Sequence, residues 1–248
     1  MSDSIHFSEI FSSIQGEGLL AGRRQLFLRL CGCNLDCRYC DTDHGQRDVC
    51  RVESEPGSGR FHATPQPLPL GWLLDLVRGW CGRLPGAHHS ISLTGGEPLL
   101  CAETLIDWLP HLRKLLPIHL ETNGTMHLAL ERVIDHLDYI SMDMKIPSTS
   151  GCTEHLWEPH RAFLQIAAAS TVSVKVVVGD ETSGEEIQQV CEIISEVAPQ
   201  TPLFLQPVSA SGHVAVAAAH LMRLQEIASS RVADVRVIPQ MHLMLGAP

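Results

Sequence analysis

The sequence is poor in basic residues and has no long apolar runs. Its 248 residues contain 18 Lys and Arg against 28 Asp and Glu, a formal net charge of −10. Duplex nucleic acid and anionic membranes bind to basic faces, so this balance argues against both as partners. No run reaches the roughly 20 apolar residues of a membrane span, and no secretory leader follows Met1. We therefore expect a cytoplasmic chain without a membrane segment.

The cysteines do not form the pattern of a secreted disulfide scaffold. There are nine of them, an odd number, in a chain for which we expect a reducing compartment. Three of them, Cys33, Cys37 and Cys40, form a C-x3-C-x2-C segment directly after the apolar stretch 25–30. The residues between these cysteines are mostly hydrophilic, so the segment does not resemble ordinary core packing.

The spacing of these three cysteines places three thiolates around one metal centre. An iron–sulfur cube normally takes four thiolates, so three would leave one iron open to a small chelating ligand. An open coordination position distinguishes a catalytic metal site from a closed structural one. The alternative is a structural zinc site with His44 as the fourth ligand.

Short apolar segments alternate with helical patterns along most of the chain. A chain of this length with 44% hydrophobic residues can bury one large core, so we expect a single domain, 1–248. Strand followed by helix, repeated about six times, implies a parallel sheet with right-handed crossovers. We predict the α/β class, as a partial (open) TIM-like βα barrel of about six βα units. The expected strands are 25–30, 91–93, 118–120, 139–144, 171–178, 203–205 and 235–238.

One segment does not fit this alternation. Residues 43–69 are largely polar and contain Pro56, Pro65, Pro67 and Pro69. Several prolines and glycines in one stretch are typical of connecting segments. We therefore expect an irregular insertion or a flexible loop there.

Polar residues collect at the carboxyl ends of the expected strands. In an α/β barrel these ends share one rim, which is where such barrels hold their chemistry. Each motif is weak alone, because a Gly-Gly turn, or a lysine such as Lys175 within a strand, is more often structural than catalytic. Their convergence on one rim with a metal segment is hard to explain structurally. The rim residues are Thr94, Gly95, Gly96 and Glu97, then 121–124, then Ser141, Asp143 and Lys145, and finally Gln206.

Two features before the cysteines leave alternatives open. The turn Gln15-Gly16-Glu17-Gly18 is either a hairpin turn or a place where backbone and carboxylate approach a ligand, and spacing favours neither. Arg29 lies in an otherwise apolar strand. If the sheet is covered on both faces, this buried cation needs an anion.

Together these motifs resemble the radical S-adenosylmethionine (SAM) superfamily. The resemblance rests on the cysteine segment, with Tyr39 before its last cysteine, and on Gly95-Gly96-Glu97-Pro98 at the end of the next strand. Within the superfamily, the chain resembles the 7-carboxy-7-deazaguanine synthase family. That match spans both ends of the chain and is more specific than the cysteine segment alone. It rests on residues 15–18, Arg29, 32–35, 40–42 and 240–248.

The resemblance implies three cofactors, a [4Fe-4S] cluster, SAM and Mg²⁺, and one substrate, 6-carboxy-5,6,7,8-tetrahydropterin. Cys33, Cys37 and Cys40 would hold the cluster, and Thr42 would bind Mg²⁺. The SAM-binding residues would be Tyr39, Gly95, Gly96, Glu97, Asn123, Ser141, Asp143, Lys145 and Gln206. The pterin would contact Ile14, Gln15, Gly16, Glu17, Arg29, Thr94, His242 and the carboxylate of Pro248, with Glu17, Arg29 and His242 as the catalytic residues.

The implied reaction is a radical ring contraction of the pterin to 7-carboxy-7-deazaguanine with loss of ammonia, which belongs to queuosine-precursor biosynthesis. Glu17 can accept from the two N–H groups of a guanidine-like edge, and Arg29 can pair with a carboxylate through two bonds. The resemblance also implies a homodimer and an electron donor such as flavodoxin. Two alternatives stand beside it, a radical activase that makes a glycyl radical on a partner protein, and a zinc-stabilised binding module.

The end of the chain is expected to take part in the site. Chain ends usually fray, but residues 243–248 are short, apolar and directly follow the last expected strand. Gly246 permits a tight bend, and Pro248 limits the conformational freedom lost on ordering. We expect the terminal carboxylate to accept from N–H groups of the pterin.

Overall fold

The computed structural model describes residues 4–40, 45, 47–152, 156–210 and 212–247. The strands are β1 Ser4–Ile5, β2 Phe7–Ile14, β3 Arg24–Leu30, β4 Val49–Glu53, β5 Phe61–Pro65, β6 Leu68–Pro69, β7 Ser90–Gly95, β8 Ile118–Thr122, β9 Tyr139–Asp143, β10 Thr171–Val178, β11 Leu203–Pro207, β12 Ser209–Ala210, β13 His213–Val214 and β14 Val235–Val237. The helices are α1 Leu70–Arg83, α2 Ala102–Leu112, α3 His127–Val133, α4 Pro147–Ser150, α5 Trp157–Ala167, α6 Gly184–Val197, α7 Ala218–Ser229 and α8 Met241–Leu245, with 3-10 turns η1 Gly18–Leu20, η2 Pro98–Cys101 and η3 Ile134–His136.

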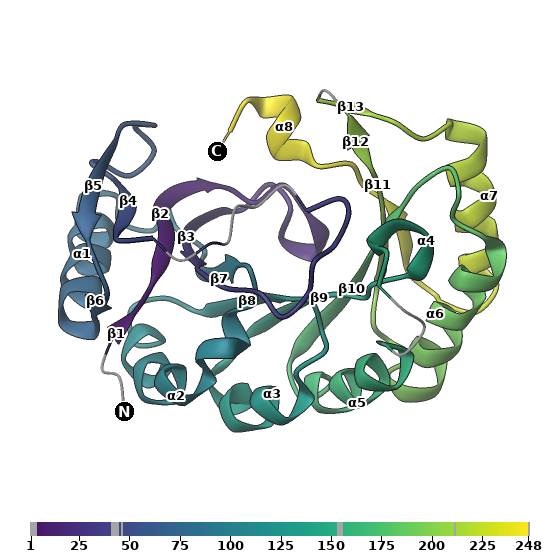
Figure 1. Ribbon diagram of the computed structural model, residues 1–248, viewed down its shortest axis with the longest axis horizontal. Coiled ribbons are helices and arrows are strands. Elements are labelled where there is room, and N and C mark those ends of the chain that lie inside the picture. The colour runs from purple at the N-terminus through teal and green to yellow at the C-terminus, as the bar shows by residue number, and fades with distance from the viewer. Residues whose placement is uncertain (1–3, 41–44, 46, 153–155, 211, 248) are drawn as a thin grey trace.

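A curved ten-stranded sheet forms the centre of the molecule, in the order β14-β11-β10-β9-β8-β7-β3-β2-β4-β5. Neighbouring strands from β3 to β14 in this order are parallel. Helices α2, α3, α5, α6 and α7 follow the outer side of the curve, and α8 lies across its open side (Figure 1). Within the described residues, six parallel strands are each followed by a helix, so the predicted open βα barrel is confirmed.

The prediction for residues 43–69 was wrong in part, because this segment contributes two strands to the sheet. β4 pairs in parallel with β2, and β5 pairs with β4 in antiparallel register, with Val49 opposite Pro65. Cys50 and Val52 are fully buried on β4. The prolines made the strand pattern of this segment hard to recognise in the sequence. Pro65 ends an edge strand, where its missing N–H removes no hydrogen bond from the sheet interior.

The alternation of side chains along each strand separates an apolar outer face from a polar inner face. On β10, Val174 and Val176 pack against the helices with no exposed surface, while Lys175 points to the inner side. β9 repeats the pattern, with Met142 buried outside and Ser141 lining the inner side. Because side chains in a strand point alternately to opposite faces, one stretch of chain builds both the core and the site.

The helices that cover the sheet are held by local features of the sequence. At the start of α6 the Ser183 side chain accepts from the backbone N–H of Glu186, and the Glu186 carboxylate accepts from the N–H of Ser183. Such a capping box stabilises a helix start by about 1 kcal/mol. None of the helices in the described part of the chain combines the length and apolar character that a bilayer span requires.

Candidate active site

A cavity of about 750 Å³ opens on the inner side of the sheet, a volume in the usual range for small-molecule sites. Most of the predicted site residues line it. They are Ile14, Gln15, Gly16, Glu17, Arg29, Cys33, Cys37, Tyr39, Cys40, Thr94, Gly95, Gly96, Asn123, Ser141, Asp143, Lys145, Gln206 and His242. The predicted magnesium ligand Thr42 and the terminal Pro248 lie outside the described residues.

The cysteine segment forms part of the cavity wall. Cys33 and Cys37 are partly buried, whereas Cys40 is exposed. The backbone N–H of Cys40 donates to the carbonyl of Cys37 at 3.0 Å, which closes a turn between these two thiols. The Asn123 side-chain amide lies 4.0 Å from the Cys33 sulfur. One loop therefore presents three thiols to the same cavity as the strand ends.

The three loop thiols are the kind of donor that an iron–sulfur cube uses. In the described part of the chain, no group of three His, Cys, Asp or Glu side chains is arranged to hold a metal ion. Zinc needs its ligands at about 2.0–2.3 Å, and His44 of the zinc alternative lies outside the described residues. Three thiols on one loop, spread along a cavity wall, suit an iron–sulfur cube with its open iron toward the cavity.

A fourth cysteine lies beside this segment, although nothing in the sequence predicts it. The Cys152 sulfur is 3.9 Å from the Cys37 sulfur. α4 brings it there, because the Ser150 carbonyl accepts from the N–H of Arg38 at 3.0 Å. Separate irons carry separate thiolates, so two sulfurs in contact are not spaced as two ligands of one cube. The three loop cysteines remain the expected cluster ligands.

The Gly95-Gly96 turn brings bare backbone to the cavity. Gly95 has a φ of +114°, and a Cβ there would collide with the backbone of Leu30. The N–H of Glu97 donates to the carbonyl of Gly32 at 2.8 Å, which fastens the turn to the start of the cysteine segment. Only glycine allows this close approach between the ends of β7 and β3, and Gly95 and Gly96 both line the cavity.

The Glu97 side chain points away from the cavity, so a contact of this residue with SAM would come from its backbone. It has no exposed surface, and its carboxylate accepts from the N–H groups of Leu99 and Asn123 at 3.0 and 2.8 Å and from the Thr122 hydroxyl at 2.9 Å. Burial raises the pKa of Glu97 despite these hydrogen bonds. Its side chain ties the end of β7 to the end of β8, and so positions Asn123.

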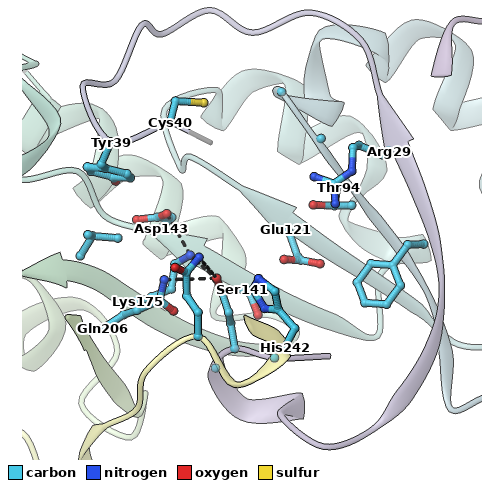
Figure 2. Close-up of a pocket in the computed structure, with 18 of the residues that line it drawn as sticks. Arg29, Tyr39, Cys40, Thr94, Glu121, Ser141, Asp143, Lys175, Gln206 and His242 are labelled. Atoms are coloured by element: carbon cyan, nitrogen blue, oxygen red, sulfur yellow. Dashed lines mark hydrogen bonds and ion pairs between the residues drawn. The ribbon is translucent and has the colours of Figure 1, made fainter. Parts of the chain in front are cut away.

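One wall of the cavity is positively charged. Arg29 and Thr94 are neighbours across β3 and β7 and lie together on this wall (Figure 2). The Arg29 guanidinium is 3.4 Å from the Glu9 carboxylate, which supplies the anion that this cation requires. Glu9 also pairs with Arg51 at 2.6 Å. Two guanidinium groups share one carboxylate, so the wall retains a positive charge that suits an anionic group.

The facing wall carries a chain of buried ions, which Figure 2 shows around Asp143, Lys175 and Gln206. The Lys175 ammonium lies 2.6 Å from Glu17 and 3.1 Å from Asp143. The Lys145 ammonium lies 2.8 Å from the same Asp143 oxygen and donates to the Tyr39 hydroxyl at 2.8 Å. These contacts join the glycine turn, β9, β10 and the cysteine segment.

These contacts set the charges of the wall. Burial alone would raise the pKa of Glu17 and of Asp143, but the neighbouring ammonium groups outweigh it and hold both pKa values below the ordinary range. Burial alone would lower the pKa of Lys145 and of Lys175, yet the carboxylates raise both. All four groups therefore remain ionised near neutral pH.

Asp143 offers a hydrogen-bond acceptor to a ligand. Its Oδ2 takes both ammonium groups, while its Oδ1 is buried and has no hydrogen-bond partner among the described residues. A buried acceptor without a partner is costly, so a bound hydroxyl or N–H group would be favourable there. The predicted SAM contact of Asp143 fits this geometry.

Buried hydrogen bonds also connect residues next to the two walls. Gln15 donates to Glu121 at 3.1 Å, and Ser92 donates to the same carboxylate at 2.5 Å. His119 lies within 2.8 Å of the Ser141 hydroxyl. Glu121 itself reaches the cavity between the two walls (Figure 2).

The C-terminal segment closes the site beside the glycine turn. The N–H of Met241 donates to the carbonyl of Gly16 at 3.0 Å, and the His242 ring occupies the space that a side chain on Gly16 would need. The Gln240 amide donates to Glu17 at 3.0 Å. The 15–18 segment lies in the hairpin connection between antiparallel β2 and β3, where the N–H of Gln15 donates to the carbonyl of Arg23 at 2.8 Å, and it also lines the cavity.

Sequence reasoning missed several cavity residues. Lys175 carried a signal, a charge within an apolar strand, but a lone lysine there is usually structural. Glu121 was expected at the rim as part of 121–124, but without a role in the site. Arg51 lay in the segment expected to be irregular, and Gln240 precedes the predicted His242 by two positions.

Fold and site define a radical SAM enzyme, and comparisons with known proteins agree. Residues 29–194 match the Radical SAM superfamily model. The chain is 50% identical over 240 residues to the 7-carboxy-7-deazaguanine synthase of Geobacter sulfurreducens, covering 96% of each chain. It is 36% identical over 259 residues to the protein of that name from Methanothermobacter thermautotrophicus, again with 96% of each covered.

The fold also matches solved structures. The crystal structure of QueE from Escherichia coli superposes with a TM-score of 0.58 at 19% identity, covering 96% of this chain and 94% of that one. The chain belongs to the 7-carboxy-7-deazaguanine synthase family. Its cofactors are accordingly a [4Fe-4S] cluster, SAM and Mg²⁺. This membership leaves the glycyl-radical activase and the zinc module without support.

Proposed function

We propose that this cavity binds 6-carboxy-5,6,7,8-tetrahydropterin beside SAM and converts the pterin to 7-carboxy-7-deazaguanine with loss of ammonia. One observation carries the proposal. The cavity places the Arg29 guanidinium opposite a wall that carries the Glu17 carboxylate, and the three-cysteine segment opens into the same space. A carboxylated pterin has the complementary ends, an anionic group and an edge of N–H donors.

Arg29 and Glu17 would orient the substrate from its two ends. The Arg29 guanidinium can form a bidentate pair with the pterin carboxylate, since Glu9 and Arg51 leave the wall a net positive charge. The Glu17 carboxylate has about four acceptor positions. Lys175, Gln206 and Gln240 occupy three of them, so one remains for a pterin N–H. Thr94 and His242 would complete the pocket.

The protein's remaining work is to hold the cofactors and exclude water. When bound, the cluster and SAM supply the radical chemistry that an unassisted protein side chain lacks. Cys33, Cys37 and Cys40 would hold the cluster, and Asp143 would accept from SAM through its unpartnered Oδ1. Tyr39, Asn123, Ser141, Lys145 and Gln206 would line the rest of the SAM pocket, while Thr42 would bind Mg²⁺.

Three further features belong to the proposal. The cluster needs an external electron, so we expect a protein donor such as flavodoxin. We expect a homodimer and a cytoplasmic location, which the family resemblance and the reducing environment required by exposed thiols support.

Anaerobic incubation of the purified protein with the pterin, SAM, Mg²⁺ and a reductant tests the function. Chromatography with mass detection should find 7-carboxy-7-deazaguanine, and the Cys37→Ala variant should yield none. Cleavage of SAM without any deazaguanine, in protein with full iron and sulfide content, would contradict the proposed substrate. Size-exclusion chromatography with light scattering tests the dimer.

A further inference from the structure

Lys175 lies between two carboxylates that come from different parts of the chain. Its ammonium is 2.6 Å from Glu17 Oε2, in the turn after β2, and 3.1 Å from Asp143 Oδ2, at the end of β9. The side chain is only 16% exposed. The proposed roles of Glu17 and Asp143 differ, one toward the pterin and the other toward SAM.

Packing does not explain a lysine at this position. The neighbours Val174 and Val176 are fully buried on the outer face of β10, so the strand is already anchored to the core. Burying an ammonium group costs free energy, and an apolar side chain of similar size would fill the space without that cost. A buried ion pair is therefore weak evidence for a purely stabilising role.

The charges on this wall balance only when Lys175 is present. Glu17 and Asp143 carry two negative charges, and Lys145 and Lys175 carry two positive ones. Lys145 contacts Asp143 and the Tyr39 hydroxyl. In the described part of the chain, Lys175 is the cation in contact with Glu17, whose other donors are the uncharged amides Gln206 and Gln240.

We propose that Lys175 is a positioning residue that holds the Glu17 carboxylate charged and oriented toward the pterin, and that it aligns this carboxylate with the SAM-binding Asp143. This inference rests on the proposed function and extends it, because it assigns substrate recognition to a pair of residues rather than to Glu17 alone. Lys175 acts through Glu17 and need not touch the substrate.

Removing the Lys175 ammonium group should leave two buried carboxylates, Glu17 and Asp143, with Lys145 in contact with Asp143 alone of the two. Burial already favours protonation of Glu17, and the charge of Lys175 is the largest effect that opposes it. The titratable groups near Glu17 and Lys175 are Asp143, at the end of β9, and Lys145, two residues after it. β11 and the C-terminal segment contribute neutral amides to Glu17, and His242 packs on Gly16 beside it. In the variant, the pKa of Glu17 should rise.

The test compares Lys175→Met, Lys175→Arg, the double variant Glu17→Gln/Lys175→Met and the exposed control Lys114→Met. The KM values for pterin and for SAM are measured anaerobically from about pH 6 to 8.5. In Lys175→Met the pterin KM should rise as the pH falls, by roughly tenfold one pH unit below the new pKa of Glu17. The SAM KM should change much less, because Asp143 keeps Lys145.

Three comparisons decide the outcome. Lys175→Arg should restore most of the pterin affinity, because it returns the charge. The double variant should bind pterin weakly at every pH, because no ionisable acid remains at position 17. Lys114→Met and wild type should show a pterin KM that does not rise toward low pH within this range.

The inference is overturned if Lys175→Met keeps a pterin KM within twofold of wild type at every pH. It is equally overturned if the KM values for pterin and SAM rise together without pH dependence, which is what a structural role produces. If Lys175→Met does not fold, Lys175→Arg and the charge-neutral double variant still test it through their pH profiles. Failure of wild type to form the deazaguanine would instead refute the proposed function.

Discussion

Protonation of His160 should destabilise the protein in a defined pH range. His160 lies on α5 without exposed surface. A backbone N–H can only donate, so the Nε2 of His160 accepts from the N–H of Lys145 at 3.0 Å. The proton of the neutral ring is then on Nδ1, which donates to the carbonyl of Gly124 at 3.0 Å. The neutral ring therefore joins two loops of the site, and a proton on Nε2 would break the bond to Lys145.

The size of this destabilisation follows from the difference between the pKa of His160 in the folded protein and its pKa in the unfolded chain. Burial lowers the pKa of His160 from 6.5 to about 4 in the folded protein. Between these two values the unfolded chain binds the proton and the folded protein does not. The free energy of unfolding therefore keeps its full value above about pH 6.5 and falls by about 1.4 kcal/mol per pH unit below it. The loss reaches roughly 3 kcal/mol at pH 4.

The assay is urea unfolding of wild type and His160→Gln across this range, under anaerobic conditions and at constant iron content. Glutamine does not titrate, so the stability advantage of wild type should shrink by roughly 3 kcal/mol between pH 6.5 and 4. His111→Gln, at an exposed position, is the matched control and should follow wild type. A wild-type advantage that stays constant with pH would refute the assigned neutral state of His160.

Further variants test the site directly. Cys33→Ala, Cys37→Ala or Cys40→Ala should abolish the brown chromophore and SAM cleavage, while Cys50→Ala and Cys191→Ala should retain both. Cys152→Ala should also retain the chromophore; its loss, measured by absorbance and iron content, would mean that Cys152 is a fourth ligand and that no iron is open. Arg29→Lys keeps the charge but loses the two-pronged geometry, so the pterin KM should rise with the cluster intact. An unchanged KM would remove Arg29 from the site. Arg51→Gln should weaken pterin binding by about 1 kcal/mol or less, because Arg51 is half exposed and acts through Glu9; binding measured at low and high salt should show the difference shrinking with salt.

The sequence alone was sufficient for the features that arise from local patterns. The alternation of strands and helices predicted the open barrel, and the strand expected at 25–30 is β3, where Leu26, Leu28 and Leu30 are buried. The three cysteines lie within a segment of eight residues, so their shared loop needed no knowledge of the fold. The strand ends marked the rim because parallel strands bring their carboxyl ends to one edge.

Only the tertiary structure decided the partners of these residues. Glu97 belongs to the expected motif, yet its carboxylate turns into the core toward Thr122. Lys175 meets Glu17 across 158 positions, and Cys152 meets Cys37 across 115. Such contacts depend on strand register and on the path of loops, neither of which local periodicity encodes. The residue types predicted the chemistry, while the packing of distant segments determined which side chains share a charge, a hydrogen bond or a sulfur contact.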